Sequence, residues 1–146
     1  MEVKNGFTLV EILIVVVILG ILAAVTLPLF SDTGTQARDA NIASNLRSVR
    51  SAIQLYKTQH RDTMPGSAGL SFENSLLKPT NAAGEEVPAG SVGAKGPYLD
   101  RIPENPFNNL STIAIDGTAG DNTDGWNFNS STGAFKADDS VDHAAL

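Results

Sequence analysis

Cysteine is absent from this chain of 146 residues, which excludes disulfides, Cys-ligated zinc, iron–sulfur clusters and thiol catalysis. Histidine is scarce too: His60 and His143 are the only two, so a His-rich metal site is excluded. Basic side chains are outnumbered, with Lys+Arg 10 against Asp+Glu 16 and a formal net charge of −6. Proteins that bind nucleic acid by neutralising phosphates need the opposite balance, so no nucleic-acid partner is expected.

Sequence motifs of enzymes are also missing. No Gly-rich phosphate loop follows a predicted strand. The two histidines do not suit a Ser-His-Asp arrangement, because His60 ends a predicted helix and His143 lies in the tail. Asp138, Asp139 and Asp142 are expected to form a frayed, solvated acidic tail, and His143 is expected to be a solvated residue of the same tail. The sequence therefore predicts a protein that is not an enzyme.

Charge is almost absent from residues 7–30, where Glu11 is the one charged side chain. A run of roughly 20 apolar residues is long enough to span a bilayer. It also exceeds the apolar core of roughly 7–15 residues found in secretory signal peptides. In lipid a lone span must satisfy its own backbone hydrogen bonds, so a helix is expected. Residues 7–30 are therefore predicted to be a transmembrane helix, and Lys4 before it favours a cytoplasmic N-terminus.

The pattern becomes amphipathic in residues 31–60, which no proline interrupts. Apolar side chains recur there at spacings of 4, 3, 4 and 3, as Ile42, Leu46, Val49, Ile53 and Tyr56. This spacing places them on one stripe of a helix. Trp126 and Phe128, two residues apart in a predicted strand, would share a face and are expected to cover the stripe.

Residues 61–146 hold ten of the thirteen glycines and six of the seven prolines, a density typical of turns and short strands. A short helix is expected at 71–77, a strand at 111–115, and a hairpin from 126–129 and 134–137. The predicted fold class is α+β. A long N-terminal helix, combining a membrane span and an amphipathic half, packs on a small C-terminal antiparallel β-sheet with long loops.

The N-terminal motif Gly6-Phe7-Thr8-Leu9-Val10-Glu11 leads directly into the apolar run. In this motif the chain resembles the superfamily of type IV pilins and type II secretion pseudopilins. The resemblance implies a pilin-like fold and a leader, residues 1–6, that a prepilin peptidase removes by cutting after Gly6. It also implies N-methylation of the new N-terminal residue, Phe7. The alternative is an ordinary single-span anchor preceded by a chance Gly-Phe pair.

Glu11 distinguishes these two interpretations. A carboxylate near the centre of a membrane span costs about 2.5–3.5 kcal/mol on insertion scales, and a plain anchor gains nothing from it. By the resemblance, the Glu11 carboxylate pairs with the ammonium that cleavage creates on Phe7 of a neighbouring subunit. Phe7 and Glu11 are then the subunit-assembly residues, and their pairing sets the axial register between subunits.

A second resemblance lies in the C-terminal half. Residues 96–107 read Gly-Pro-Tyr-Leu-Asp-Arg-Ile-Pro-Glu-Asn-Pro-Phe, which is similar to the Tyr–Leu segment and Pro-x-[Asn/Asp]-Pro pattern of major pseudopilins. Gly125-Trp126 and the later Thr132-Gly133 turn are similar as well. The alternative interpretation is a generic turn of a β-meander.

The loop 116–125 is rich in oxygen ligands of the kind that calcium prefers. Major pseudopilins bind calcium at about this place. By that resemblance calcium is the only cofactor expected, with Asp116, Asp121 and Asp124 as its side-chain ligands. The spacing of an EF-hand is absent. The alternative is a solvated turn whose Asp, Asn and Gly residues suit turn geometry.

The hypothesis that results is a structural filament subunit, major-pseudopilin-like, of a type II secretion pseudopilus or a type IV pilus-like fibre that serves protein secretion. The expected parts are the leader 1–6, a transmembrane and filament-core helix 7–30, an amphipathic half 31–60 and a loop-rich β head domain 61–146. The subunit is expected in the bacterial inner membrane, with its C-terminal domain in the periplasm or outside, and then in an extracytoplasmic filament.

Its expected partners are copies of itself in a helical filament. The resemblance adds the prepilin peptidase, the inner-membrane assembly platform, the assembly ATPase system and minor pseudopilins. Two other functions stay open at this point: a membrane-anchored binding module that never polymerises, and a secreted domain with an unusual signal peptide. Pseudopilus and pilus stay open as well.

Overall fold

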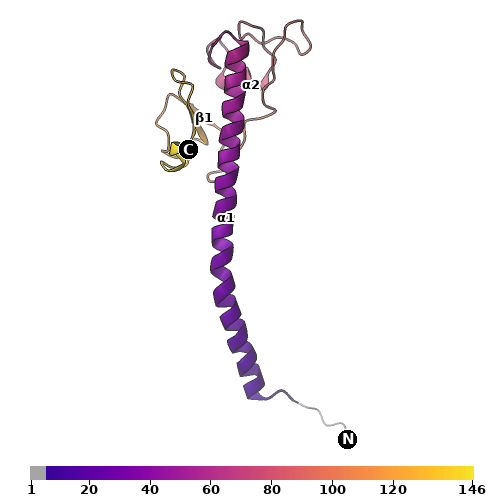
Figure 1. Ribbon diagram of the computed structural model, residues 1–146, viewed down its shortest axis with the longest axis vertical. Coiled ribbons are helices and arrows are strands. Elements are labelled where there is room, and N and C mark those ends of the chain that lie inside the picture. The colour runs from indigo at the N-terminus through magenta and orange to yellow at the C-terminus, as the bar shows by residue number, and fades with distance from the viewer. Residues whose placement is uncertain (1–5) are drawn as a thin grey trace. The chain divides into compact units, whose positions relative to one another are not determined.

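The computed structural model describes residues 6–146, and for residues 25–33 it describes the backbone but not the side chains. The chain divides into two compact units, Met1–Asp39 and Ala40–Leu146. In its described part, the first unit consists of helical residues and the short segment before them. Every residue of the hydrophobic core cluster belongs to the second unit, which ends at the C-terminus marked in Figure 1.

Helix α1 (Leu9–Gln59) has 51 residues, so the long N-terminal helix expected from the sequence is confirmed. Glu11 lies in its first turn and Lys57 in its last, where each charge complements the helix dipole. In the first unit, the large apolar side chains between Leu9 and Leu22 are all more than half exposed. Because these positions are nearly consecutive, they cover every side of the helix.

Among the residues whose side chains the structure describes, no helix combines the length and apolar character that a membrane crossing requires. The predicted span 7–30 includes residues 25–30, whose side chains lie outside the described set. The span therefore stays a prediction.

The second half of α1 forms one wall of the core. Its five stripe residues are at most 1% exposed, as the amphipathic spacing predicted: Ile42, Leu46, Val49, Ile53 and Tyr56. Trp126 and Phe128 are buried in the same cluster, which confirms that the hairpin covers this stripe. Burial of such side chains, at about 25 cal/mol per Å² of apolar surface, is the main stabilising contribution.

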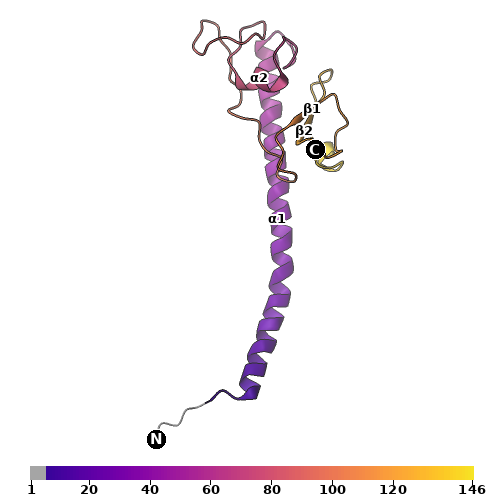
Figure 2. The same cartoon turned by 180° about the vertical axis from the view of Figure 1, so that it is seen from behind.

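The sheet has three strands in the order β1-β2-β3, and two of them are labelled in Figure 2. Strand β2 (Trp126–Phe128) pairs antiparallel with β3 (Phe135–Ala137), as the hairpin predicted. Strand β1 (Ile113–Ile115) pairs parallel with β2, so the expectation of a wholly antiparallel sheet is wrong. The connection 116–125 is long enough to carry the chain back before β2 begins, whereas a tight hairpin would have forced antiparallel pairing.

Two short helices complete the second unit. Helix α2 (Phe72–Leu77) begins at Ser71, whose hydroxyl accepts a hydrogen bond from the N–H of Asn74, and it adds Phe72 and Leu76 to the core. The 3₁₀ helix η1 (His143–Ala145) lies near the C-terminus. Between these elements the backbone runs mostly in turns and loops, as the glycine and proline content indicated.

Candidate assembly segment and a buried polar network

The predicted cleavage site lies before α1 and is accessible. Gly6 and Phe7 are both exposed, and Phe7 is 83% exposed. A Cβ atom placed on Gly6 would meet no heavy atom within 4 Å, so the protein itself does not shield this peptide bond. Residues 1–5 of the predicted leader lie outside the described residues.

Glu11 forms a capping box with Thr8. Its Oε2 accepts hydrogen bonds from the backbone N–H of Thr8 at 2.8 Å and from the Thr8 hydroxyl at 2.9 Å. In return, the Glu11 N–H donates to the Thr8 hydroxyl oxygen at 3.3 Å. Reciprocal bonds of this kind satisfy N–H groups that a helix start otherwise leaves unpaired. The Thr-x-x-Glu spacing is the sequence signal of this box, whereas the interpretation of the sequence rested on the charge of Glu11 alone.

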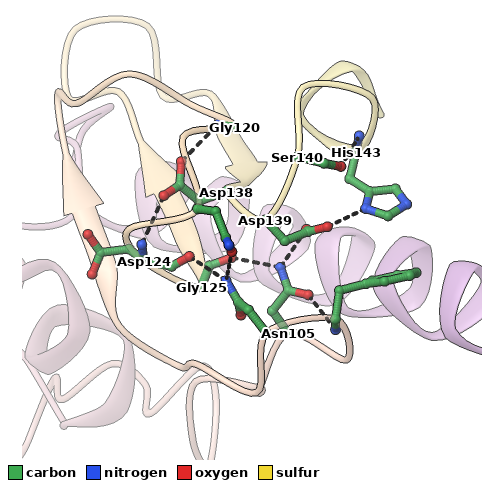
Figure 3. Close-up of polar contacts among 11 residues, drawn as sticks. Asn105, Gly120, Asp124, Gly125, Asp138, Asp139, Ser140 and His143 are labelled. Carbon is green, nitrogen blue, oxygen red and sulfur yellow. Dashed lines mark hydrogen bonds and ion pairs between the residues drawn. The ribbon is translucent and has the colours of Figure 1, made fainter.

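The Pro-x-Asn-Pro segment of the second unit contains Asn105, which is fully buried. Its amide nitrogen donates to the carbonyl of Gly125 at 2.9 Å and to Oδ1 of Asp139 at 2.8 Å (Figure 3). Its amide oxygen accepts from the N–H of Phe107 at 3.0 Å. Asn105 thus joins three segments that lie far apart in sequence, and a buried amide must find such partners to avoid a large desolvation penalty.

Asp138 is also fully buried, which corrects the prediction that it belongs to a frayed tail. Its two carboxylate oxygens accept hydrogen bonds from the loop before β2, Oδ1 from the N–H of Gly120 at 2.8 Å and Oδ2 from the N–H of Asp124 at 3.0 Å (Figure 3). A buried carboxylate is tolerated when N–H donors surround it. Asp138 therefore holds two points of the loop 116–125 against the end of β3.

Asp139 and His143 form a pair, which corrects the prediction that both are solvated. Nδ1 of His143 lies 2.5 Å from Oδ2 of Asp139, and the two side chains are only 21% and 5% exposed. The ring of His143 also packs against the ring of Phe107, with 4.2 Å between their centroids. This pair connects η1 to the network around Asn105, so the C-terminal residues are part of the folded unit. Asp142 is exposed, as predicted.

The three residues predicted as calcium ligands are all hydrogen-bonded, and the Thr123 hydroxyl lies within reach of both Asp121 Oδ1 and Asp124 Oδ2, at 2.7 and 3.5 Å. Asp116 accepts from the N–H and the hydroxyl of Ser130, both at 2.7 Å, and these bonds, the hydroxyl first, lower its pKa. Asp121 accepts from the hydroxyl and the N–H of Thr123, and these bonds lower its pKa. Asp124 is half-buried, and its N–H donates to Asp138.

In the described part of the chain, no group of three or more His, Cys, Asp or Glu side chains is placed to hold a metal ion. Calcium binding stays a prediction of the sequence alone.

The known proteins that are similar to this chain belong to type II secretion systems and type IV pili. A family model described as a prokaryotic N-terminal methylation motif matches residues 1–27. The type II secretion system core protein G of Pseudomonas aeruginosa is 32% identical over 117 residues, which cover 80% of this chain and 78% of that protein. Its counterpart in Aeromonas hydrophila is 28% identical over 140 residues, 86% of this chain and 93% of that protein.

A pilus protein is similar as well. The type IV narrow pilus major component PilA5 of Thermus thermophilus is 34% identical over 95 residues, which cover 56% of this chain and 82% of that protein. No solved structure matches the chain significantly.

Proposed function

Because the chain belongs to the superfamily of type II secretion pseudopilins and type IV pilins, we propose that it is a structural filament subunit of a type II secretion pseudopilus. The observation that carries the proposal is the first half of α1, whose apolar side chains are exposed on every side. Such a surface is unstable in water and needs lipid or copies of itself around it. In the membrane, lipid would surround these side chains. In the fibre core, the apolar helices of neighbouring subunits would surround them.

We propose that processing occurs between Gly6 and Phe7. Gly has no side chain to obstruct a peptidase, and this peptide bond lies in an exposed segment before α1. Removal of six residues would create an ammonium on Phe7, and methylation would keep its charge. The capping box survives this cut, because Thr8 and Glu11 both lie beyond it.

The capping box also suggests how Glu11 serves assembly. Both bonds from Thr8 reach Oε2, and among the described residues none reaches Oε1. We propose that Oε1 receives the ammonium of Phe7 from a neighbouring subunit when the apolar helices pack together. Within that packed core, the Glu11 carboxylate and the Phe7 ammonium would each need the other. Loss of either one would leave a buried charge without a partner, which is strongly unfavourable.

Co-expression with a prepilin peptidase tests the processing step. Mass spectrometry should find the loss of six residues, whereas an anchored module would stay uncut and a signal peptide would remove about 25–30 residues. Gly6→Leu should leave the full-length precursor in the membrane. Gly20→Leu is the matched control, because Gly20 also has no heavy atom within 4 Å of an added Cβ but lies away from the cut. Normal processing of Gly6→Leu would contradict the assignment.

Glu11→Gln tests the charge separately from the cap. Glutamine can still close a capping box, so this variant should insert and be cleaved normally, yet it should fail to polymerise because the Phe7 ammonium lacks a partner. Filament yield can be measured by shearing and electron microscopy, with Glu11→Ala beside it as the variant that loses both cap and charge. Wild-type yield from Glu11→Gln would show that the carboxylate serves as a cap alone.

A type IV pilus is the second candidate, favoured by the 34% identity to a narrow-pilus component. The relatives named core protein G match more of this chain, 86% in one case against 56% for the pilus component. Deleting the gene should therefore leave exported proteins in the periplasm. Intact secretion with loss of surface fibres would favour the pilus instead.

A further inference from the structure

A cationic groove runs along the second half of α1 within the unit Ala40–Leu146. It encloses about 530 Å³, with Ala43, Leu46 and Leu146 as its apolar part and Arg47 and Arg50 as its charged part. No Asp or Glu lines it, and Leu146 places a backbone oxygen beside Arg50. Residues 40–59 of α1 likewise contain basic side chains and no Asp or Glu, so the field at the groove is positive.

The two arginines play different parts in this groove. Arg50 is held in place, because its Nε donates to the carbonyl of Phe135 at 2.9 Å and its Nη1 to the backbone oxygen of Leu146 at 3.1 Å. Arg47 is exposed, and within residues 6–146 as described it forms no ion pair. A guanidinium presents a fork of donors that matches a carboxylate, and Arg47 is free to present it outward.

The surface of opposite charge on the same unit is the loop 116–125, with three aspartates and no basic residue. Asp116 is occupied by Ser130 and Asp124 is half-buried, whereas Asp121 is exposed near the middle of the loop. The hydrogen bonds from Thr123 lower the pKa of Asp121, so this side chain is ionised at neutral pH. Asp138 holds the loop backbone on both sides of Asp121, which limits its movement.

We propose that the loop 116–125 of one copy docks into the cationic groove of a second copy, with Asp121 facing Arg47. The proposal rests on the proposed function, since it names a contact between subunits of that filament. The groove and the loop are different surfaces of one unit, so the contact is head-to-tail. A head-to-tail contact that does not close on itself generates an open helical fibre, and complementary charges fix its register.

Other grooves on the unit suit an acidic loop less well. Two of them contain Arg101, but Glu104 lines one and Asp100 lines the other. A third contains Lys136 and no acid, but Gly117 and Ala119 of the loop itself belong to its lining. An acid within the lining offers its own charge to the arginine and repels an incoming carboxylate. The groove at Arg47 is distinguished by two arginines and by the absence of Asp and Glu from its lining.

A charge swap in the full-length chain, expressed with its cognate assembly machinery, tests the contact. Arg47→Glu and Asp121→Arg should each lower the filament yield by about tenfold or more, because each places like charges together. The double variant should recover most of the wild-type yield, since it restores the pair in reverse. Arg61→Glu and Glu73→Arg, two exposed charges outside the groove and the loop, are the matched controls and should assemble normally.

Cysteine cross-linking provides a second readout that leaves both charges intact. The chain has no cysteine, so Ser51→Cys in the groove lining and Asn122→Cys in the loop introduce the only thiols. Together they should yield a ladder of disulfide-linked multimers from filaments, whereas Ser51→Cys with Glu73→Cys should not.

The proposal is overturned if the single charge reversals assemble at wild-type yield, if the double variant is not rescued, or if assembled filaments give no ladder. Cross-linking of Ser51→Cys to a different protein alone would also overturn it, because the groove would then have another occupant. If wild-type chain never assembles, the proposed function fails first and the docking contact fails with it.

Discussion

At the scale of single residues, carboxylates in this chain accept hydrogen bonds from N–H and hydroxyl groups, both nearby and distant in sequence. Glu11 caps the start of α1, Asp138 receives two loop N–H groups, and Asp116 receives both donors of Ser130. Each acidic group thereby orders a turn or a helix end, which hydrophobic burial cannot do for a polar loop. Some of the acidic residues thus order turns and helix ends, whereas Asp121 provides the negative charge proposed to face Arg47.

The titration of Asp116 gives a pH prediction. Hydrogen bonds from the hydroxyl and then the N–H of Ser130 lower its pKa from the ordinary value of 3.8. Because the folded pKa lies below the unfolded one, this bond pair stabilises the fold above about pH 3.8, and the contribution is lost as pH falls through the folded pKa. Ser130→Ala should raise the pKa of Asp116 toward 3.8, measured by carboxylate NMR. Ser131→Ala is the control, and an equal rise there would contradict the assignment.

At the scale of elements, the connection between β1 and β2 determines the topology of the sheet. It returns the chain to start β2 beside β1 in parallel, and Asp138 and Asn105 then hold it at Gly120, Asp124 and Gly125. Gly125 is the tightest point of this arrangement. A Cβ atom there would lie 2.1 Å from the carbonyl oxygen of Leu110, far closer than any van der Waals contact allows.

Gly125→Ala should therefore destabilise the protein by about 3 kcal/mol, near the upper end of the range for overpacking a tight site. Thermal unfolding followed by circular dichroism measures the change. Gly34→Ala is the matched control: an added Cβ there meets nothing within 4 Å, and alanine favours a helix interior over glycine by about 1 kcal/mol. An unchanged melting temperature for Gly125→Ala would mean that Leu110 does not approach Gly125 so closely.

At the scale of the whole molecule, the two units have different requirements. Ala40–Leu146 contains the complete hydrophobic core, from Ile42 to Ala137, and the buried polar network. In the first unit the large apolar side chains between Leu9 and Leu22 are exposed, so they depend on lipid or on other subunits. The hydrophobic core and the exposed apolar helix surface thus lie in different parts of one chain.

Residues 40–146 alone are accordingly expected to fold in water and to unfold cooperatively, with a melting temperature near that of the full-length chain. Differential scanning calorimetry checks this. A fragment that starts at residue 48 should not fold, because it lacks the fully buried Ile42 and Leu46, and each large core side chain contributes roughly 2–5 kcal/mol. Cooperative unfolding of that shorter fragment would show that the start of the stripe is dispensable.

The sequence by itself determined the features that depend on residues close to one another along the chain. The period of α1 predicted its buried stripe, turn residues predicted the β2–β3 hairpin, and the Gly6-Phe7 motif predicted the family. These features follow from local periodicity and turn geometry, which a single segment carries within itself. The capping box of Thr8 and Glu11 was readable in the same way.

Only the tertiary structure decided which polar residues are buried. Asp138 and His143 look like a solvated tail in the sequence, because polar residues near a chain end are usually exposed. Asp138 is buried because Gly120 and Asp124 supply N–H donors from a distant segment. His143 is partly buried beside Asp139, which in turn accepts a hydrogen bond from the distant Asn105. The parallel pairing of β1 with β2 has the same origin: it depends on the path of the connecting loop, which Asp138 holds through hydrogen bonds across 14 and 18 residues of sequence.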